Sequence, residues 1–378
     1  MKYLNDLKLY DMHIMLQSSY NCNHRCWFCN EWSKTGRSWS KSECDIVVDK
    51  LSMLPDTINK IFIQFHGGEP TLCRYWEYIQ YQLVDKLKDR QLFIQTQTNL
   101  SLSHSRLESF LEKIHAIRMP NHVIDINCSY HLGMQDVKQY ARKLQLITPH
   151  VAYGGVQFIG EIVCQQEKTL DEFKYLRDRF HDKICYRHVV INNPNIAEIK
   201  EKYYKFNIKL NEHDSNFEYR YTLENYPELF SEYYPYGWLL KFNTELYGYD
   251  SIWSRYYISD LLRNMLGKHE LYSDNKLKYD MSSEQVIDKL YVEAKNKYYD
   301  QLYPAKVLPR GVFCNSSSNG MCISSDLRIF NCLDYLHKNI NGVSIHDINM
   351  KTHFLNKFKR CVLSSCNSCN FHILKRYW

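Results

Sequence analysis

The sequence predicts an α/β fold: a partial, TIM-like (β/α)6 barrel, then a helical insertion, then a small cysteine-rich α+β domain. Apolar segments of strand length alternate with segments of helical periodicity across the first half of the chain. Short polar motifs follow several of these strands, and parallel α/β folds carry their functional groups at such strand ends. Nine of the fourteen cysteines fall in two groups near the ends of the chain.

The composition is that of a globular protein. The chain has 378 residues, of which 44% are hydrophobic and 24% charged, and this length suffices for one large domain and a smaller one. The net charge is +6 without a long Lys/Arg run, so no nucleic-acid partner is expected. No stretch reaches the roughly 18 uncharged apolar residues of a membrane span, and the N-terminus lacks a signal-peptide pattern. We therefore expect a cytoplasmic protein without a membrane partner, whose clustered cysteines bind metal.

The first strand is expected at residues 12–19 (MHIMLQSS), which lead directly into the first cysteine group. The Ser40-Lys-Ser-Glu43 pattern is a capping box, and it predicts a helix that ends before Pro55. Such alternation predicts parallel strands joined by right-handed crossovers, with their ends at one mouth. The further strands are expected at 60–65, 91–96, 123–130, 155–163 and 184–191, and the further helices at 75–88, 105–115, 135–147 and from the Thr169-Leu-Asp-Glu172 box onward.

Three domains are expected along the chain. The barrel covers residues 1–195. Residues 196–305 break the alternation, are rich in Tyr, Asn and Lys, and are interpreted as a helical linker or insertion. Its tyrosines suit either an aromatic core or a binding face. Residues 306–378 form the cysteine-rich domain, in which 321–333 are expected to be two short strands that turn at Asp326-Leu-Arg328.

The first cysteine group is Cys22-Asn-His-Arg-Cys26-Trp-Phe-Cys29. Three thiolates on one short loop can hold three corners of a cubane iron–sulfur cluster and leave the fourth iron open to a ligand. A structural zinc site is the alternative that the residues leave open.

With the aromatic Phe28 before its last cysteine, this CxxxCxφC loop resembles the signature of the radical S-adenosylmethionine (radical SAM) enzymes. The resemblance implies that Cys22, Cys26 and Cys29 bind a 4Fe–4S cluster whose open iron binds S-adenosylmethionine. It also implies cleavage of this cofactor to a 5′-deoxyadenosyl radical that abstracts a substrate hydrogen. A flavodoxin or ferredoxin is the electron donor that such an enzyme implies.

The Gly67-Gly68-Glu69-Pro70 segment resembles the family's motif for the methionine end of the cofactor, and a plain strand-to-helix turn is its alternative. Glycines permit close backbone approach, and the Glu69 carboxylate can pair with an ammonium group. The resemblance further implies that Asn99 and Ser129 contact the methionine carboxylate and the ribose hydroxyls. His131 is expected to be an ordinary hydrogen-bonded histidine.

The C-terminal cysteines resemble the auxiliary-cluster domains called SPASM or, in the shorter form, twitch. The resemblance implies one auxiliary 4Fe–4S cluster for electron transfer, with Cys322 and Cys361 as further candidate ligands. A zinc site with four thiolates fits the spacing equally well. The turn carries Asp326-Leu327 where these domains commonly carry Asp-Gly. The four implied ligands are Cys314, Cys332, Cys366 and Cys369.

The resemblance implies an oxidoreductase-type radical enzyme, and its commonest substrate class is a ribosomally made peptide that is cross-linked, dehydrogenated or epimerised. A small metabolite such as a sugar or nucleoside is the alternative substrate. A non-catalytic zinc-binding module is a distant third reading. No residue is assigned as a catalytic acid or hydrogen donor.

Overall fold

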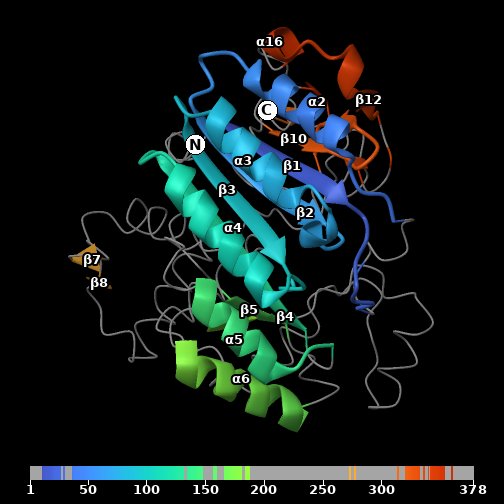
Figure 1. The fold of residues 1–378 in the computed structure, drawn as a ribbon. Coiled ribbons are helices and arrows are strands. Elements are labelled where there is room, and N and C mark those ends of the chain that lie inside the picture. The colour runs from blue at the N-terminus through green and yellow to red at the C-terminus, as the bar shows by residue number, and fades with distance from the viewer. Residues whose placement is uncertain are drawn as a thin grey trace, which may run out of the picture.

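Figure 1 shows the computed structural model of the chain. Among the residues that it describes, no helix has the length and apolarity needed to cross a membrane. Phe28, residues 361–378 and almost all of the helical linker or insertion expected at 196–305 lie outside the described part. The described residues are 11–26, 29, 36–131, 134–147, 156–159, 166–180, 184–187, 272–273, 276–277, 313–314, 320–332, 335–336, 339, 341–353 and 359–360.

The core of the fold is a sheet in which six strands lie in sequence order, each parallel to the next. The sequence-based prediction of a parallel alternation is therefore confirmed. The predicted first strand has the observed bounds, and the later ones differ by a few residues. The strands are β1 (Met12–Ser19), β2 (Lys60–Gly67), β3 (Gln91–Thr98), β4 (His122–His131), β5 (Val156–Ile159) and β6 (Ile184–Arg187).

Five helices connect these strands, and Figure 1 shows α2 to α5 lying along one face of the sheet. Right-handed crossovers between sequential parallel strands place every connecting helix on the same side, which explains this arrangement. A short 3-10 turn, η1 (Pro70–Leu72), follows β2 directly. The helices are α2 (Lys41–Ser52), α3 (Trp76–Lys86), α4 (His104–Ile117), α5 (Val137–Ile147) and α6 (Gln166–Phe180).

The helix starts show one confirmed prediction and one wrong one. The capping box is present, because the Ser40 side chain accepts from the Glu43 amide and the Glu43 carboxylate accepts from the Ser40 amide. The predicted start at the Thr169 box is wrong, since Thr169 lies inside α6. The Gln-Glu-Lys sequence that precedes Thr169 has high helix propensity and begins the helix earlier.

The two faces of the sheet differ in chemistry. Alternate residues such as Ile14, Ile63 and Ile94 pack against the helices in one apolar core. The opposite face, which we call the polar face, carries the residues between them, because successive strand side chains point to opposite sides. On β1 to β4 the polar face includes His13, Met15, Gln17, Lys60, Phe62, Gln64, His66, Gln91, Phe93, Gln95, Gln97, Val123, Asp125, Asn127, Ser129 and His131.

The expected hairpin within 321–333 is confirmed as β10 (Gly320–Ile323) and β11 (Arg328–Phe330). It does not stand apart, because β10 pairs in parallel with β1 and extends the main sheet. Leu327 occupies the turn with φ 59°, and its side chain is buried in the apolar core. Burial of a leucine offsets the roughly 1 kcal/mol cost of the left-handed conformation, so leucine stands where glycine is common.

The remaining described elements are short. Within 196–305, two strands pair as a small hairpin, which the expectation of a helical segment did not include. The domain boundaries at 195 and 305 stay a prediction. These elements are β7 (Tyr272–Ser273), β8 (Lys276–Leu277), β9 (Phe313–Cys314), β12 (Val343–Ser344), η4 (Ile345–Asp347), α16 (Met350–His353) and β13 (Lys359–Arg360).

Candidate cofactor and cluster site

The cysteine loop leaves the C-terminal end of β1 and is held there by the segment that follows β2. The Gly68 amide donates to the Ser19 carbonyl at 3.0 Å, and the Glu69 amide donates to the Asn21 carbonyl at 2.7 Å. The Gly-Gly-Glu-Pro segment and the cysteine loop are therefore hydrogen-bonded directly to each other, at adjacent ends of parallel strands.

The two glycines make this contact sterically feasible. Gly67 has φ +129°, a conformation that L side chains rarely adopt. A Cβ on Gly68 would lie 2.4 Å from the Asn21 carbonyl oxygen and 2.6 Å from that of Tyr20. These glycines therefore allow close contact with the backbone at the start of the cysteine loop, and the close approach to a cofactor that the sequence predicted for them stays a prediction.

Gly68→Ala should destabilise the protein by about 3 kcal/mol, because the added methyl group meets backbone that no rotamer change can relieve. It should also lower the iron bound per chain, since relief of the clash moves the cysteine loop. Urea unfolding and iron content measure the two effects. The matched control is Gly36→Ala, whose Cβ would meet only side-chain atoms of Asn21 and no backbone. Because that side chain can rotate away, a loss of under about 1 kcal/mol is expected; equal losses for both variants would contradict the prediction.

Glu69 is a buried carboxylate, 1% exposed. Oε1 accepts from the Thr71 amide at 3.1 Å, the Thr71 hydroxyl, and the Thr98 hydroxyl at 2.6 Å, while Oε2 accepts from the Asn99 amide at 2.7 Å. Burial raises the pKa of Glu69, against these hydrogen bonds, which lower it. Lys143 of α5 lies nearby, and the negative charge of Glu69 favours the protonated form of this lysine. Glu69 thus joins the ends of β2 and β3 around the cysteine loop.

Asn23 ties the cysteine loop to the turn after β3. Its Oδ1 accepts from Asn99 Nδ2 at 3.0 Å and from Ser101 Oγ at 2.7 Å. The predicted cofactor contact Asn99 is buried, with 4% exposure. Its hydrogen bond to Asn23 gives it a structural role as well. Sequence reasoning missed Asn23 because nothing in its local pattern distinguishes it from a solvated loop residue.

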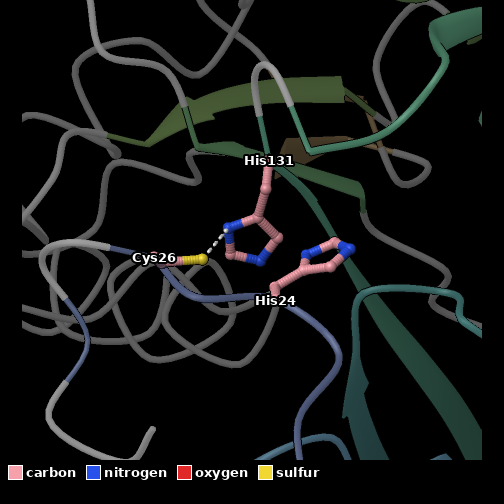
Figure 2. Close-up of side chains that lie close together, drawn as sticks. All are labelled: His24, Cys26 and His131. Carbon is pink, nitrogen blue, oxygen red and sulfur yellow. Dashed lines mark hydrogen bonds between the residues drawn. The ribbon is translucent and has the colours of Figure 1, made fainter.

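Cys26 lies close to two histidines, and Figure 2 shows its contact with one of them, His131. His131, at the end of β4, places Nδ1 at 3.3 Å from Cys26 Sγ. The ring of His24 meets that of His131 edge to face, with centroids 5.2 Å apart, and the ligand atoms of all three lie within 4.8 Å of one another. The expectation of an ordinary role for His131 missed this contact, which only the pairing of distant segments creates.

The other two cysteines of the loop belong to the same region. The His24 amide donates to Cys22 Sγ at 3.4 Å, and the Cys29 amide donates to the Cys26 carbonyl at 3.0 Å. Burial raises the pKa of the Cys22 thiol, and the charges of Glu69 and Cys29 raise it further. Cys22 is therefore electrostatically coupled to both the glutamate and the last cysteine of the motif.

The remaining predicted cofactor contacts lie around this loop. Pro70 begins η1 and is buried beside Glu69. Ser129 is half-buried on β4, on the polar face and two residues before His131. The proposed roles of Asn99, Ser129 and the Gly-Gly-Glu-Pro residues toward a cofactor stay predictions.

The second cysteine group is described in part. Cys322 is buried, and it packs with Met15, Phe330 and Cys332 in a small apolar cluster at the edge of the sheet. Cys314 is placed by its backbone, opposite Lys359 in the β9–β13 pair. Cys361, Cys366 and Cys369 lie outside the described residues, so the predicted auxiliary ligand set stays a prediction.

The donor set of the cysteine loop fits an iron–sulfur cluster. Thiolates are soft ligands that favour iron–sulfur clusters, Cu(I) and zinc. The loop carrying them is fixed by the glycine contact and by Asn23, and it lies at the C-terminal ends of parallel strands, where α/β folds bind ligands. Fold and site together define an α/β protein that carries three cysteines on one loop at its strand ends.

The sequence comparison specifies this class further. Residues 16–203 match the Radical SAM superfamily, a stretch that spans the cysteine loop and β2 to β6. This part of the chain is a radical SAM domain, and such a domain implies S-adenosylmethionine and a 4Fe–4S cluster. No curated protein matches the sequence.

The solved structures that match this chain include three with low sequence identity and low TM-scores. Streptococcus suis SuiB is 12% identical, with 92% of this chain and 66% of that chain covered and a TM-score of 0.46. BtrN in complex with AdoMet and 2-DOIA is 18% identical, with 48% and 57% covered and a TM-score of 0.28. Methylornithine synthase (PylB) is 9% identical, with 50% and 57% covered and a TM-score of 0.33. The chain therefore spans less than two thirds of the length of each.

Proposed function

We propose that this chain is a radical SAM enzyme in which Cys22, Cys26 and Cys29 hold a 4Fe–4S cluster. The observation that carries the proposal is the docking of the cysteine loop onto the Gly-Gly-Glu-Pro segment, through the amides of Gly68 and Glu69. Two motifs separated by about forty residues of sequence are thereby part of one site. An isolated zinc knuckle would need only the cysteines.

When bound, S-adenosylmethionine and the cluster supply a 5′-deoxyadenosyl radical for hydrogen abstraction. Glu69 fixes the strand ends with four hydrogen bonds, three of them to Oε1 and one to Oε2. A carboxylate offers about four lone-pair sites over its two oxygens. Oε2 thus keeps acceptor capacity for the methionine ammonium, and Asn99 and Ser129 are proposed to contact the carboxylate and ribose.

We propose that the six parallel strands form a partial barrel and that the C-terminal cysteines form a SPASM- or twitch-type site. The pairing of β9 with β13 supports the second point, because it joins the strand of Cys314 to the residues that precede Cys361. One auxiliary 4Fe–4S cluster there would transfer electrons. Cys314, Cys332, Cys366 and Cys369 are its proposed ligands.

The proposed reaction is oxidative, with a ribosomally made peptide as substrate and a flavodoxin or ferredoxin as electron donor. The tyrosine-rich stretch between Tyr203 and Tyr303 supports a peptide, since phenol side chains offer large amphipathic contact area. A cytoplasmic location is proposed as well, because thiols there stay reduced and free to bind metal.

Metal analysis of anaerobically reconstituted protein tests the proposal. About eight irons and eight sulfides per chain are expected for two 4Fe–4S clusters, and about four of each if only the loop of Cys22–Cys29 is loaded. Dithionite reduction with S-adenosylmethionine should then yield 5′-deoxyadenosine. Stoichiometric zinc without charge-transfer absorbance would contradict the proposal.

A further inference from the structure

A directed chain of hydrogen bonds crosses the polar face and ends on Asp125. His13 bonds to Gln64, Gln64 Nε2 donates to Gln95 Oε1 at 2.8 Å, and Gln95 Nε2 donates to Asp125 Oδ2 at 2.8 Å. The register places Gln64, Gln95 and Asp125 in one row across β2, β3 and β4. Each amide orientation in this row is fixed by the acceptor at its end.

Below this row, on the N-terminal side, the polar face is closed by aromatic rings. The rings of His13 and Phe62 are stacked at 4.6 Å, and those of Phe62 and Phe93 lie 5.0 Å apart. Above it, toward the cysteine loop, lie Gln17 and Asn127. The row that ends at Asp125 therefore lies between an aromatic floor and the candidate cluster site.

Several acceptors on this face have no hydrogen-bond partner in the described structure: Asp125 Oδ1, Asn127 Oδ1 and Gln17 Oε1, together with one donor, Gln17 Nε2. The side chains are buried, with exposures of 1% for Asp125, 4% for Asn127 and 0% for Gln17. Buried polar groups in folded proteins are nearly always paired, because an unpaired group costs about 1–3 kcal/mol. Among Asp125, Asn127 and Gln17, three unpaired acceptor atoms stand against one unpaired donor atom, which favours a ligand rich in hydrogen-bond donors.

Among the residues that the structure describes, no lysine or arginine lies beside Asp125 on the polar face. The polar-face lysine of β1 to β4 is Lys60, which is exposed at the start of β2, four residues before Gln64. Only burial and the hydrogen bonds from Gln95 and the Ile126 backbone act on the pKa of Asp125, and burial raises it to about 7. Glu69, by contrast, has Lys143 nearby. A buried carboxylate without a counter-ion is costly unless a cation reaches it.

We propose that the polar face binds the substrate's primary ammonium group at Asp125, with Asn127 and Gln17 as further contacts. This inference rests on the proposed function, since it places substrate beside the radical-generating site. An ammonium group supplies three donors and one positive charge, which match the unpaired acceptors and the missing counter-ion. The amine belongs either to a lysine side chain of a peptide or to a small amino metabolite.

Thermal unfolding of the cluster-loaded chain in the presence of S-adenosylmethionine tests the inference with two matched pairs of probes. Nα-acetyl-lysine amide is compared with Nα-acetyl-norleucine amide, and glucosamine is compared with glucose. Either amine should raise the unfolding midpoint by about 2 °C at a concentration of roughly ten times its Kd, and its neutral counterpart should not. A shift with the lysine derivative alone would identify a peptide as the substrate, and a shift with glucosamine alone would identify a small amino metabolite.

Variants assign the effect to the polar face. Asp125→Asn keeps the shape and should abolish the amine-dependent shift, and Asn127→Ala should reduce it. The control is Gln80→Leu, since Gln80 is an equally buried, unpartnered glutamine on α3 rather than on the polar face. It should leave the amine-dependent shift unchanged.

Amines that shift the midpoint no more than their neutral counterparts would overturn the inference, and so would an unchanged shift in Asp125→Asn. If that variant does not fold, an unchanged shift in Asn127→Ala overturns it equally. The readout requires no cleavage of S-adenosylmethionine. A chain that carries zinc in place of iron would therefore contradict the proposed function and still allow the amine shift to be measured.

Discussion

Cys26→Ala should abolish the N-terminal cluster and reduce 5′-deoxyadenosine production by more than about 100-fold. The loss of a group that only supports a metal ligand already costs 10–100-fold, and Cys26 is itself the proposed ligand. Its thiol lies 3.3 Å from His131 Nδ1, so the substitution also removes one of the two contacts between the loop and the end of β4, the other being the ring contact of His24. Iron content, charge-transfer absorbance and chromatography of the dithionite-driven reaction measure the effect.

Cys128→Ala is the matched control. Cys128 is a buried cysteine of β4 that belongs to the apolar core on the helix side of the sheet. Its substitution should cost about 1 kcal/mol of unfolding free energy and leave cluster and activity in place. Persistent 5′-deoxyadenosine production in Cys26→Ala would show that this loop does not hold the catalytic cluster.

Relative to Asp125→Asn, the wild-type protein should lose about 4 kcal/mol of unfolding free energy as the pH rises from 4 to 8. Burial raises the pKa of Asp125 from 3.8 to about 7, which corresponds to about 4 kcal/mol at 1.36 kcal/mol per pH unit. Between these values the folded state binds the proton and the unfolded state does not. The stabilising contribution is therefore full below about pH 4, is lost toward pH 7, and stays lost above it.

Urea unfolding of both proteins from pH 5 to 8 should show about 3 kcal/mol of this loss, at 1.36 kcal/mol per pH unit, and the comparison cancels pH effects that both proteins share. Asp326→Asn is the control. Burial raises the pKa of Asp326, but hydrogen bonds from Ser324 and Arg328 outweigh burial and lower it. Its contribution is lost only on acidification below about pH 4, so its difference from wild type should stay flat over this range. If the difference in unfolding free energy between wild type and Asp125→Asn does not change with pH, the Asp125 carboxyl group is not isolated from charge or solvent.

The local elements of this fold could be predicted because their signals are local. The bounds of β1 follow from its apolar run, and the start of α2 follows from the Ser40 capping box. The Thr169 box misled because the same local pattern also occurs inside a helix. Polar residues also stand within the predicted buried strands, namely Gln64, Gln95 and Asp125. No pattern in the sequence assigned them a role.

By itself the sequence determined the alternation of strands and helices and the spacing of Cys22, Cys26 and Cys29, since periodicity and motif spacing act over a few residues. Only the tertiary structure decided which distant segments meet. It placed β10 beside β1, His131 against Cys26, and Asn99 against Asn23. It also buried Asp125, whose Oδ1 has no hydrogen-bond partner among the residues that the structure describes. Such contacts arise from packing between elements far apart in the chain, and no short-range pattern encodes them.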